Sequence, residues 1–418
     1  MVGLRRNIAR IRQWGPVADQ FLFGAASGIL LLSASATLSP SQFGEFGLAY
    51  TFVASVLVIW RGGVLARLTL IDSHTELSRR LTRLVKPLMW VSLAPILLSL
   101  WFVFSAHGSD GVAGASIVIC ASLPMLMLYE TLRQGMMMLD KNSMPLTVSF
   151  IWLLASLLFL ALSLSRNSVW PGLLGWVLSG LLGVGVLLAT FKRVARSHHG
   201  PIQAGDNDPT PVPSLWHFSL VSLLTAMAGL GIALVAYLFA GPVVLATIIV
   251  LNTAMYPLSV YTQAAPILIR NLSNLGVRGL AVTILGAVAL AFLWYLALQT
   301  VFANPAVELL GSSWVLSKSL LWLAGLNLAT TASIALSVAY LHRNGRASTV
   351  RWLILSTAPI RVLLALIVAV ITRSAEWIIL VEFIAQFISL LALLGFCFAS
   401  ARTSEHRRPQ FPVNVISD

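Results

Sequence analysis

The chain has 418 residues, of which 58% are hydrophobic and only 10% charged, and its mean hydropathy is +0.89. Soluble domains are about 45–50% apolar and about 25% charged, so this composition excludes a soluble enzyme, a disordered protein and a nucleic-acid-binding module. In such a chain the net charge of +13 is explained by membrane topology, because Lys and Arg are enriched in cytoplasmic loops. We predict an all-α polytopic membrane protein that binds no nucleic acid.

Apolar runs of the length that crosses a bilayer, about 20 residues, recur along the whole chain. Most of the 27 Lys and Arg residues lie at the two ends and at the even-numbered junctions between these runs, which predicts cytoplasmic N- and C-termini. A basic N-terminal segment, 3–14, is expected to form a short surface helix, with a disordered tail as the alternative. We predict twelve spans, at 17–38, 45–67, 84–106, 112–138, 145–165, 169–191, 215–239, 242–269, 279–302, 317–341, 350–372 and 376–400.

The largest break in hydropathy is residues 196–214, a segment rich in proline, glycine and aspartate, which is typical of a linker. Its adjacent His198 and His199 lack further ligands nearby in sequence, so we expect no metal site and no cofactor. The predicted organisation is a basic N-terminus, two six-helix bundles separated by this linker, and a tail: 1–16, 17–195, 196–214, 215–400 and 401–418.

The two halves carry similar segments. The second predicted span ends in the sequence GGVLAR at 62–67, and the eighth ends in APILIR at 265–270. Six spans in each half give both repeats the same orientation in the membrane, as in transporters with parallel repeats. This pattern predicts two bundles related by a pseudo-two-fold axis.

The start of the chain resembles a known family. Asp19 and Gln20 open the first span, and residues 38–46, LSPSQFGEF, form the turn into a second span that ends in Gly62, Gly63 and Arg67. This pattern is similar to that of bacterial polysaccharide flippases of the multidrug/oligosaccharidyl-lipid/polysaccharide (MOP) superfamily. A basic, glycine-bearing turn after the tenth span, 340–346, is also similar.

The resemblance implies two six-helix bundles around a central cavity that opens alternately to each side of a bacterial inner membrane. The implied substrate is an oligosaccharide linked through pyrophosphate to a polyprenyl lipid, moved to the outer leaflet for surface or exopolysaccharide assembly. The implied partners are this glycan lipid, the bilayer and a polysaccharide polymerase or export machinery. No enzymatic chemistry is implied, and the motifs do not reach the sugar-binding positions.

Charged residues inside the spans are the first candidates for a site, because buried charge in lipid is costly. Arg361 lies about 15 Å from either end of the eleventh predicted span at the helical rise. Pro359 is expected to weaken the helix there. Arg361 is therefore a candidate pyrophosphate ligand. The alternative is a structural ion pair with Glu382 of the next span.

Two further arginines are candidates with structural alternatives of their own. Arg61 lies beside Gly62 and Gly63 and would bind substrate, or else extend its side chain to the cytoplasmic surface. Arg133 lies three residues after Glu130, a spacing more typical of a local ion pair.

The eighth predicted span carries a polar stripe suited to a sugar. The spacing places its members on one helical face, and amides and hydroxyls both donate and accept hydrogen bonds. Helix–helix hydrogen bonding is the alternative. The stripe consists of Asn252, Tyr256, Ser259 and Gln263.

The alternative function is an ion-coupled drug or small-molecule antiporter of the same superfamily. Its coupling groups would be buried acids, for which Asp19, Glu130 and Glu382 are the candidates. Three arginines lie within the spans, whereas one of the three acids, Asp19, lies only at a span boundary. This excess of cations favours an anionic substrate. An ATP-driven exporter is excluded because the sequence lacks a phosphate-binding loop.

Overall fold

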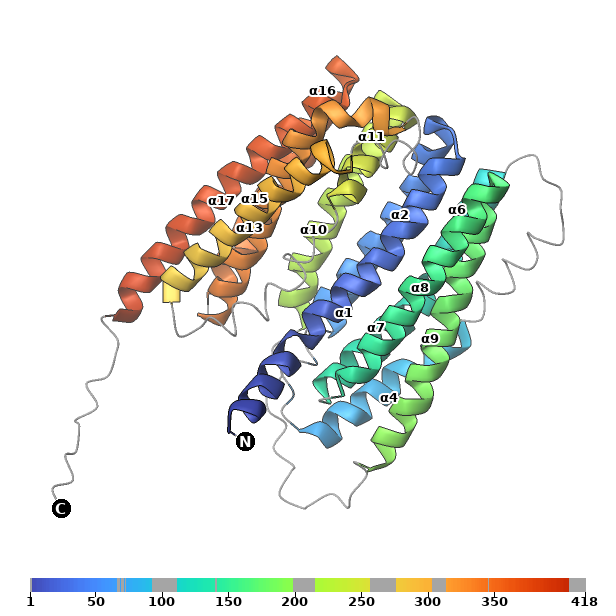
Figure 1. Cartoon of the computed structure of the whole chain (residues 1–418). Coiled ribbons are helices and arrows are strands. Elements are labelled where there is room, and N and C mark those ends of the chain that lie inside the picture. Colours follow the sequence, from blue (N-terminus) through green and yellow to red (C-terminus); the bar gives the residue numbers. More distant parts are fainter. Residues whose placement is uncertain are drawn as a thin grey trace.

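The chain folds almost entirely into helices (Figure 1). The computed structural model describes residues 2–65, 68, 71, 73–91, 111–139, 141–197, 215–255, 276–302, 313–344 and 346–405. The first half contains α1 (Val2–Thr37), α2 (Pro40–Ile59), the π-helix η1 (Trp60–Leu65), α4 (His74–Val91), α6 (Gly111–Ala121), α7 (Leu123–Met138), α8 (Ser143–Arg166) and α9 (Val169–Ser197). The second half contains α10 (Leu215–Val235), η2 (Ala236–Ala240), α11 (Pro242–Ala254), α13 (Gly276–Thr300), η4 (Lys318–Leu320), α15 (Leu321–Arg343), α16 (Ala347–Thr372) and α17 (Ala375–Glu405).

The described residues include ten helices that are long and apolar enough to cross a membrane, each overlapping one of the predicted spans. The remaining two predicted spans, 84–106 and 242–269, run into residues outside the described part. Large apolar side chains such as Leu182, Leu285 and Ile371 are exposed on the helices. Such a surface is stable in lipid, where the backbone bonds within each helix and apolar side chains face the acyl chains. The chain is a multi-pass membrane protein.

The helices form two bundles, in agreement with the prediction. In the first, α1 packs on α8, α8 on α9, α2 on α6, and α7 on both α4 and α9. In the second, α10 packs on α16, and α15 packs on α13 and α17. Helix α1 begins and α17 ends at the same end of the molecule (Figure 1), as the predicted common side of the termini requires.

The seam between the bundles runs along α2 and η1, which pack against α10 and α11. Glycines allow this close approach. A Cβ placed on Gly44 would lie 2.0 Å from the Pro242 carbonyl oxygen, and one on Gly62 would lie 1.8 Å from Ser222 Oγ. Both ends of the second span therefore contact the second bundle directly.

The turn that carries the family resemblance has a clear structural role. Ser39 caps α2 and forms a reciprocal capping box with Gln42, while Pro40 occupies the first turn. Phe43 is fully buried, and Gly44 is one of the two glycines in contact at the seam. These residues position α2, so the motif is a feature of the fold.

Two local expectations differ from the structure. The basic segment 3–14 is not a separate surface helix, because α1 is continuous from Val2 to Thr37. Helix α16 passes through Pro359 without interruption. Between the second and third predicted spans the structure also contains most of α4, whose buried Leu77, Leu81 and Val85 pack it onto the bundle. Residues 198–214 of the predicted linker, and with them His198 and His199, lie outside the described part.

Candidate functional site

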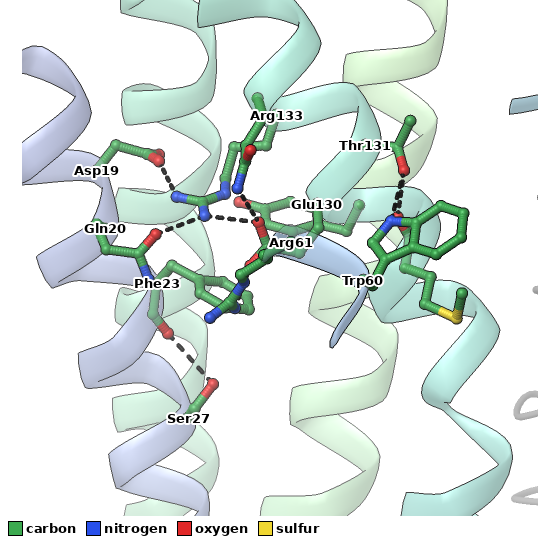
Figure 2. A network of polar contacts seen from close by, with 12 residues as sticks. Asp19, Gln20, Phe23, Ser27, Trp60, Arg61, Glu130, Thr131 and Arg133 are labelled. Atoms are coloured by element: carbon green, nitrogen blue, oxygen red, sulfur yellow. Dashed lines mark hydrogen bonds and ion pairs between the residues drawn. The ribbon is translucent and has the colours of Figure 1, made fainter. Parts of the chain in front are cut away.

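A buried polar network lies in the first bundle, where α1, η1, α7 and α8 meet (Figure 2). Arg133 of α7 is its centre. One of its terminal nitrogens donates to Asp19 Oδ2, and the other donates to Gln20 Oε1 at 2.6 Å and to Glu130 Oε2 at 2.7 Å. Arg61 of η1 donates to the second oxygen of Glu130. Two carboxylates and two guanidinium groups therefore balance one another.

Neutral groups complete this network. Ser149 Oγ donates to Asp19 Oδ1 at 2.7 Å and lies 2.8 Å from the Tyr129 hydroxyl. The Phe23 ring lies 5.0 Å from the Arg133 guanidinium carbon and 5.7 Å from that of Arg61, which is within cation–π range. Buried charges are tolerated when paired and hydrogen-bonded in this way.

The members of the first network differ in exposure. The side chains of Asp19 and Glu130 are fully buried and that of Arg133 is 1% exposed, whereas Arg61 keeps 22% exposed. Arg133 therefore presents no surface to a substrate in this conformation and holds the two acids together. Its expected ion pair with Glu130 is present. Arg61 does not reach away to the surface but turns inward to Glu130.

A second network lies in the second bundle. Arg361 of α16 donates to Glu382 Oε1 of α17 at 2.6 Å, and Gln386 Nε2 donates to the same oxygen at 2.9 Å. Thr331 of α15 donates to Gln386 Oε1. The Arg361 and Glu382 side chains are 19% and 16% exposed. The structural alternative predicted for Arg361 is thus the geometry observed.

All three arginines within the spans have an acidic partner, so the cationic excess inferred from the sequence does not persist as an unpaired charge. In all three, the guanidinium Nε is buried and has no hydrogen-bond partner, but Arg61 and Arg361 differ from Arg133 in the use of their terminal nitrogens. In Arg61 and Arg361 one terminal nitrogen donates to a single carboxylate oxygen, whereas Arg133 uses both terminal nitrogens. A guanidinium with unused donors is suited to accept a second anionic group.

The polar stripe of the eighth predicted span lies mostly outside the described residues. Asn252 is exposed on α11, and Tyr256, Ser259 and Gln263 are beyond the part of α11 that the structure describes. The stripe stays a prediction.

Several residues of these networks were missed by the sequence analysis. Gln20, Tyr129, Ser149, Thr331 and Gln386 are uncharged, and buried hydroxyls and amides are common in membrane helices. For Gln386 a signal existed, because it lies one helical turn after Glu382 on the same face.

An apolar pocket of about 440 Å³ lies between α10 and α16. Small residues on the two helices, Ala228, Gly231 and Ala358, open it, and Pro359 and Leu363 line it. None of its lining residues is charged, and neither Arg361 nor Glu382 is among them.

No protein-family model matches the sequence, and no curated protein is similar to it. Solved structures match over nearly the whole chain. An inward-facing multidrug resistance MATE family transporter of the MOP superfamily has a TM-score of 0.59 at 15% identity and covers 92% of this chain and 96% of its own. A eukaryotic MATE transporter has a TM-score of 0.60 at 15% identity, covering 97% and 99%.

A third match is a MOP superfamily transporter from Pyrococcus furiosus, with a TM-score of 0.54 at 14% identity and coverage of 94% and 95%. At these identities the matches show the fold. The chain therefore has the fold of the MATE transporters of the MOP superfamily.

Proposed function

We propose that the chain is a flippase that moves a polyprenyl-pyrophosphate-linked oligosaccharide from the cytoplasmic to the outer leaflet of a bacterial inner membrane by alternating access, without enzymatic chemistry. The observation that carries the proposal is the pair of partly exposed arginines, Arg61 and Arg361. Each is held within a bundle by one carboxylate and has a donor to spare.

A pyrophosphate that enters a low-dielectric bundle must exchange water for fixed hydrogen-bond donors. A guanidinium offers a planar fork that matches two phosphate oxygens. A phosphate oxygen can take the place of the carboxylate oxygen that Arg361 now binds, and Gln386 still donates to Glu382 after this exchange. At Arg61, Glu130 keeps the Arg133 bond. The exchanged acids are therefore not left without partners.

The position of Arg61 fits a transport cycle. It lies in η1, next to Gly62, and η1 packs against α10 of the second bundle. Relative motion of the two bundles must change this seam. An anion held by Arg61 would thus lie where the movement takes place. Asn252 supplies an exposed amide on α11 for the sugar, and the prenyl tail remains in lipid.

An ion-coupled drug antiporter is the second candidate, and two observations favour it. Asp19 and Glu130 are buried acids within the first bundle, and two of the structural neighbours are described as multidrug resistance or MATE transporters. For the Pyrococcus furiosus neighbour, the reverse polarity of its binding pocket is described as suggesting a different function, so this fold accommodates pockets of different polarity.

Deletion of the gene from the native host distinguishes the flippase from the drug antiporter. For a flippase, extracted membranes should accumulate polyprenyl-pyrophosphate-linked saccharides, and surface glycan should fall, with partners such as a polymerase left without substrate. Sensitivity to cationic dyes should stay unchanged. Unchanged lipid-linked saccharide together with increased dye sensitivity would contradict the flippase and support the antiporter.

A further inference from the structure

Helix α4 presents two chemically different faces. Leu77, Leu81 and Val85 are buried against the first bundle, and the contact with α7 is so close that a Cβ on Gly135 would lie 2.8 Å from Leu81 Cδ1. The apolar face of α4 is therefore covered by the first bundle. The opposite face points away from the bundle and is free to contact what surrounds the protein.

That opposite face is a basic stripe. Arg79, Arg83, Lys86 and Trp90 are all exposed, and their spacing of four, three and four residues places them on one side of the helix. Glu76 is the only acid of α4, and it bonds Arg79 at 2.9 Å and Arg80 at 2.6 Å. Within the described part of the chain, neither Arg83 nor Lys86 has an acidic partner. Exposed ion pairs are weak, so Arg79 can leave Glu76.

The stripe lies at one end of the helical bundle. Figure 1 shows α4 crossing the lower ends of α7 and α9, at the end of the molecule where α1 begins. The last turns of α9 add exposed Lys192 and Arg193 there. Trp90, with 73% of its surface exposed, ends the stripe, and tryptophan is enriched at the boundary between headgroups and acyl chains. Long basic side chains reach from such a position to phosphate groups.

We propose that the Arg79–Arg83–Lys86–Trp90 stripe of α4 is a docking surface for anionic phospholipid headgroups in the leaflet at this end of the bundle, which the cation asymmetry predicts to be cytoplasmic. The three basic residues bind headgroup phosphates, and Trp90 sets the depth. Charge complementarity and the tryptophan together select a lipid surface over a soluble partner. The binding ties the outer layer of the first bundle to the membrane while the second bundle moves.

The test uses the full-length protein in a non-ionic detergent, with phosphatidylglycerol or phosphatidylcholine added in mixed micelles and bound lipids counted by mass spectrometry of the intact complex. Each basic residue near an anionic surface contributes about fivefold to binding. We expect the wild type to prefer phosphatidylglycerol. The combined variant Arg79→Gln, Arg83→Gln and Lys86→Gln should lose more than about tenfold of that preference.

Two matched variants complete the design. Arg166→Gln, Lys318→Gln and Arg373→Gln remove the same charge from three exposed, dispersed positions and should change the preference less than about twofold. Arg79→Lys and Arg83→Lys keep the charge and should keep the preference. Should the triple variant fold poorly, Arg83→Gln alone is expected to show about a fivefold loss.

Two results would overturn the proposal: a wild type without phosphatidylglycerol preference, and equal loss of the preference in the dispersed-charge variant. In the first case, binding of soluble heparin through the stripe would assign the surface to a soluble polyanion.

Discussion

In the first bundle Arg133 is 1% exposed and bonds Asp19, Gln20 and Glu130, whereas in the second bundle Arg361 keeps 19% of its side chain exposed and bonds Glu382 alone. In the first arrangement both terminal nitrogens of the guanidinium donate hydrogen bonds, and the side chain is shielded from solvent. In the second, one terminal nitrogen donates to Glu382 and part of the side chain stays exposed. Position within a span alone therefore does not make an arginine a ligand; what matters is the number of partners it already holds.

Arg61 is intermediate between these two. It shares Glu130 with Arg133 but keeps 22% of its side chain exposed, and it lies in η1 at the seam between the bundles. The first bundle thus contains a structural arginine and an accessible one bound to the same carboxylate. This arrangement lets the Arg61 bond be exchanged while Glu130 keeps its hydrogen bond from Arg133.

Replacement of Arg133 should have the largest effect on stability. Arg133→Ala leaves Asp19 buried without a counter-ion and removes one of the two arginines that bond Glu130. Removal of one member of a buried ion pair costs about 3–5 kcal/mol. We expect little folded protein in the membrane and a strongly lowered thermal unfolding midpoint. Arg361→Ala is the matched control and should be clearly more stable than Arg133→Ala. Equal stability of the two variants would contradict the distinction between a buried structural arginine in the first network and a partly exposed one in the second.

Replacement of Arg61 should affect transport more than stability. In Arg61→Ala, Glu130 keeps its bond from Arg133, so a loss of about 1.5–3 kcal/mol is expected, in the range of one charged hydrogen bond. Protein abundance should remain near normal while glycan export falls severely. Normal export at normal abundance would remove Arg61 from the proposed site.

The neutral part of the first network should show the smallest effect. Tyr129→Phe removes the hydroxyl that lies 2.8 Å from Ser149 Oγ, but Ser149 can still donate to Asp19. We expect a loss of about 1 kcal/mol in the unfolding free energy and unchanged export. A transport defect in this variant, at unchanged stability, would show that the buried network takes part directly in the cycle.

Much of the architecture follows from sequence because hydropathy is a local property. Ten described helices overlap predicted spans, since each carries its own apolar signal. Most of helix α4 falls in a predicted junction because arginines and a lysine interrupt its apolar residues, and only packing on α7 shows which face is buried. Its basic stripe is visible in the sequence, but the orientation of that stripe is not.

The site was predictable only where its partners are close in sequence. Glu130 and Arg133 lie one turn apart on α7, and Arg361 and Glu382 lie on consecutive helices joined by a short turn at Arg373 and Ser374. The bonds from Arg133 to Asp19 and from Arg61 to Glu130 join residues separated by 114 and 69 positions. No local pattern encodes such pairs, because they depend on how α1, η1 and α7 meet.

The exchange of partners at Arg361 is the central claim, and a double-mutant comparison tests it most directly. In a host that lacks the chain, outer-leaflet glycan is measured at matched protein level for the wild type, Arg361→Lys, Arg361→Ala, and Arg361→Ala combined with Glu382→Ala. We predict partial export with lysine, which keeps the charge but not the fork, and loss of export with alanine and with the double variant. Restored export in the double variant would contradict the claim, because it would show that Arg361 serves only to neutralise Glu382.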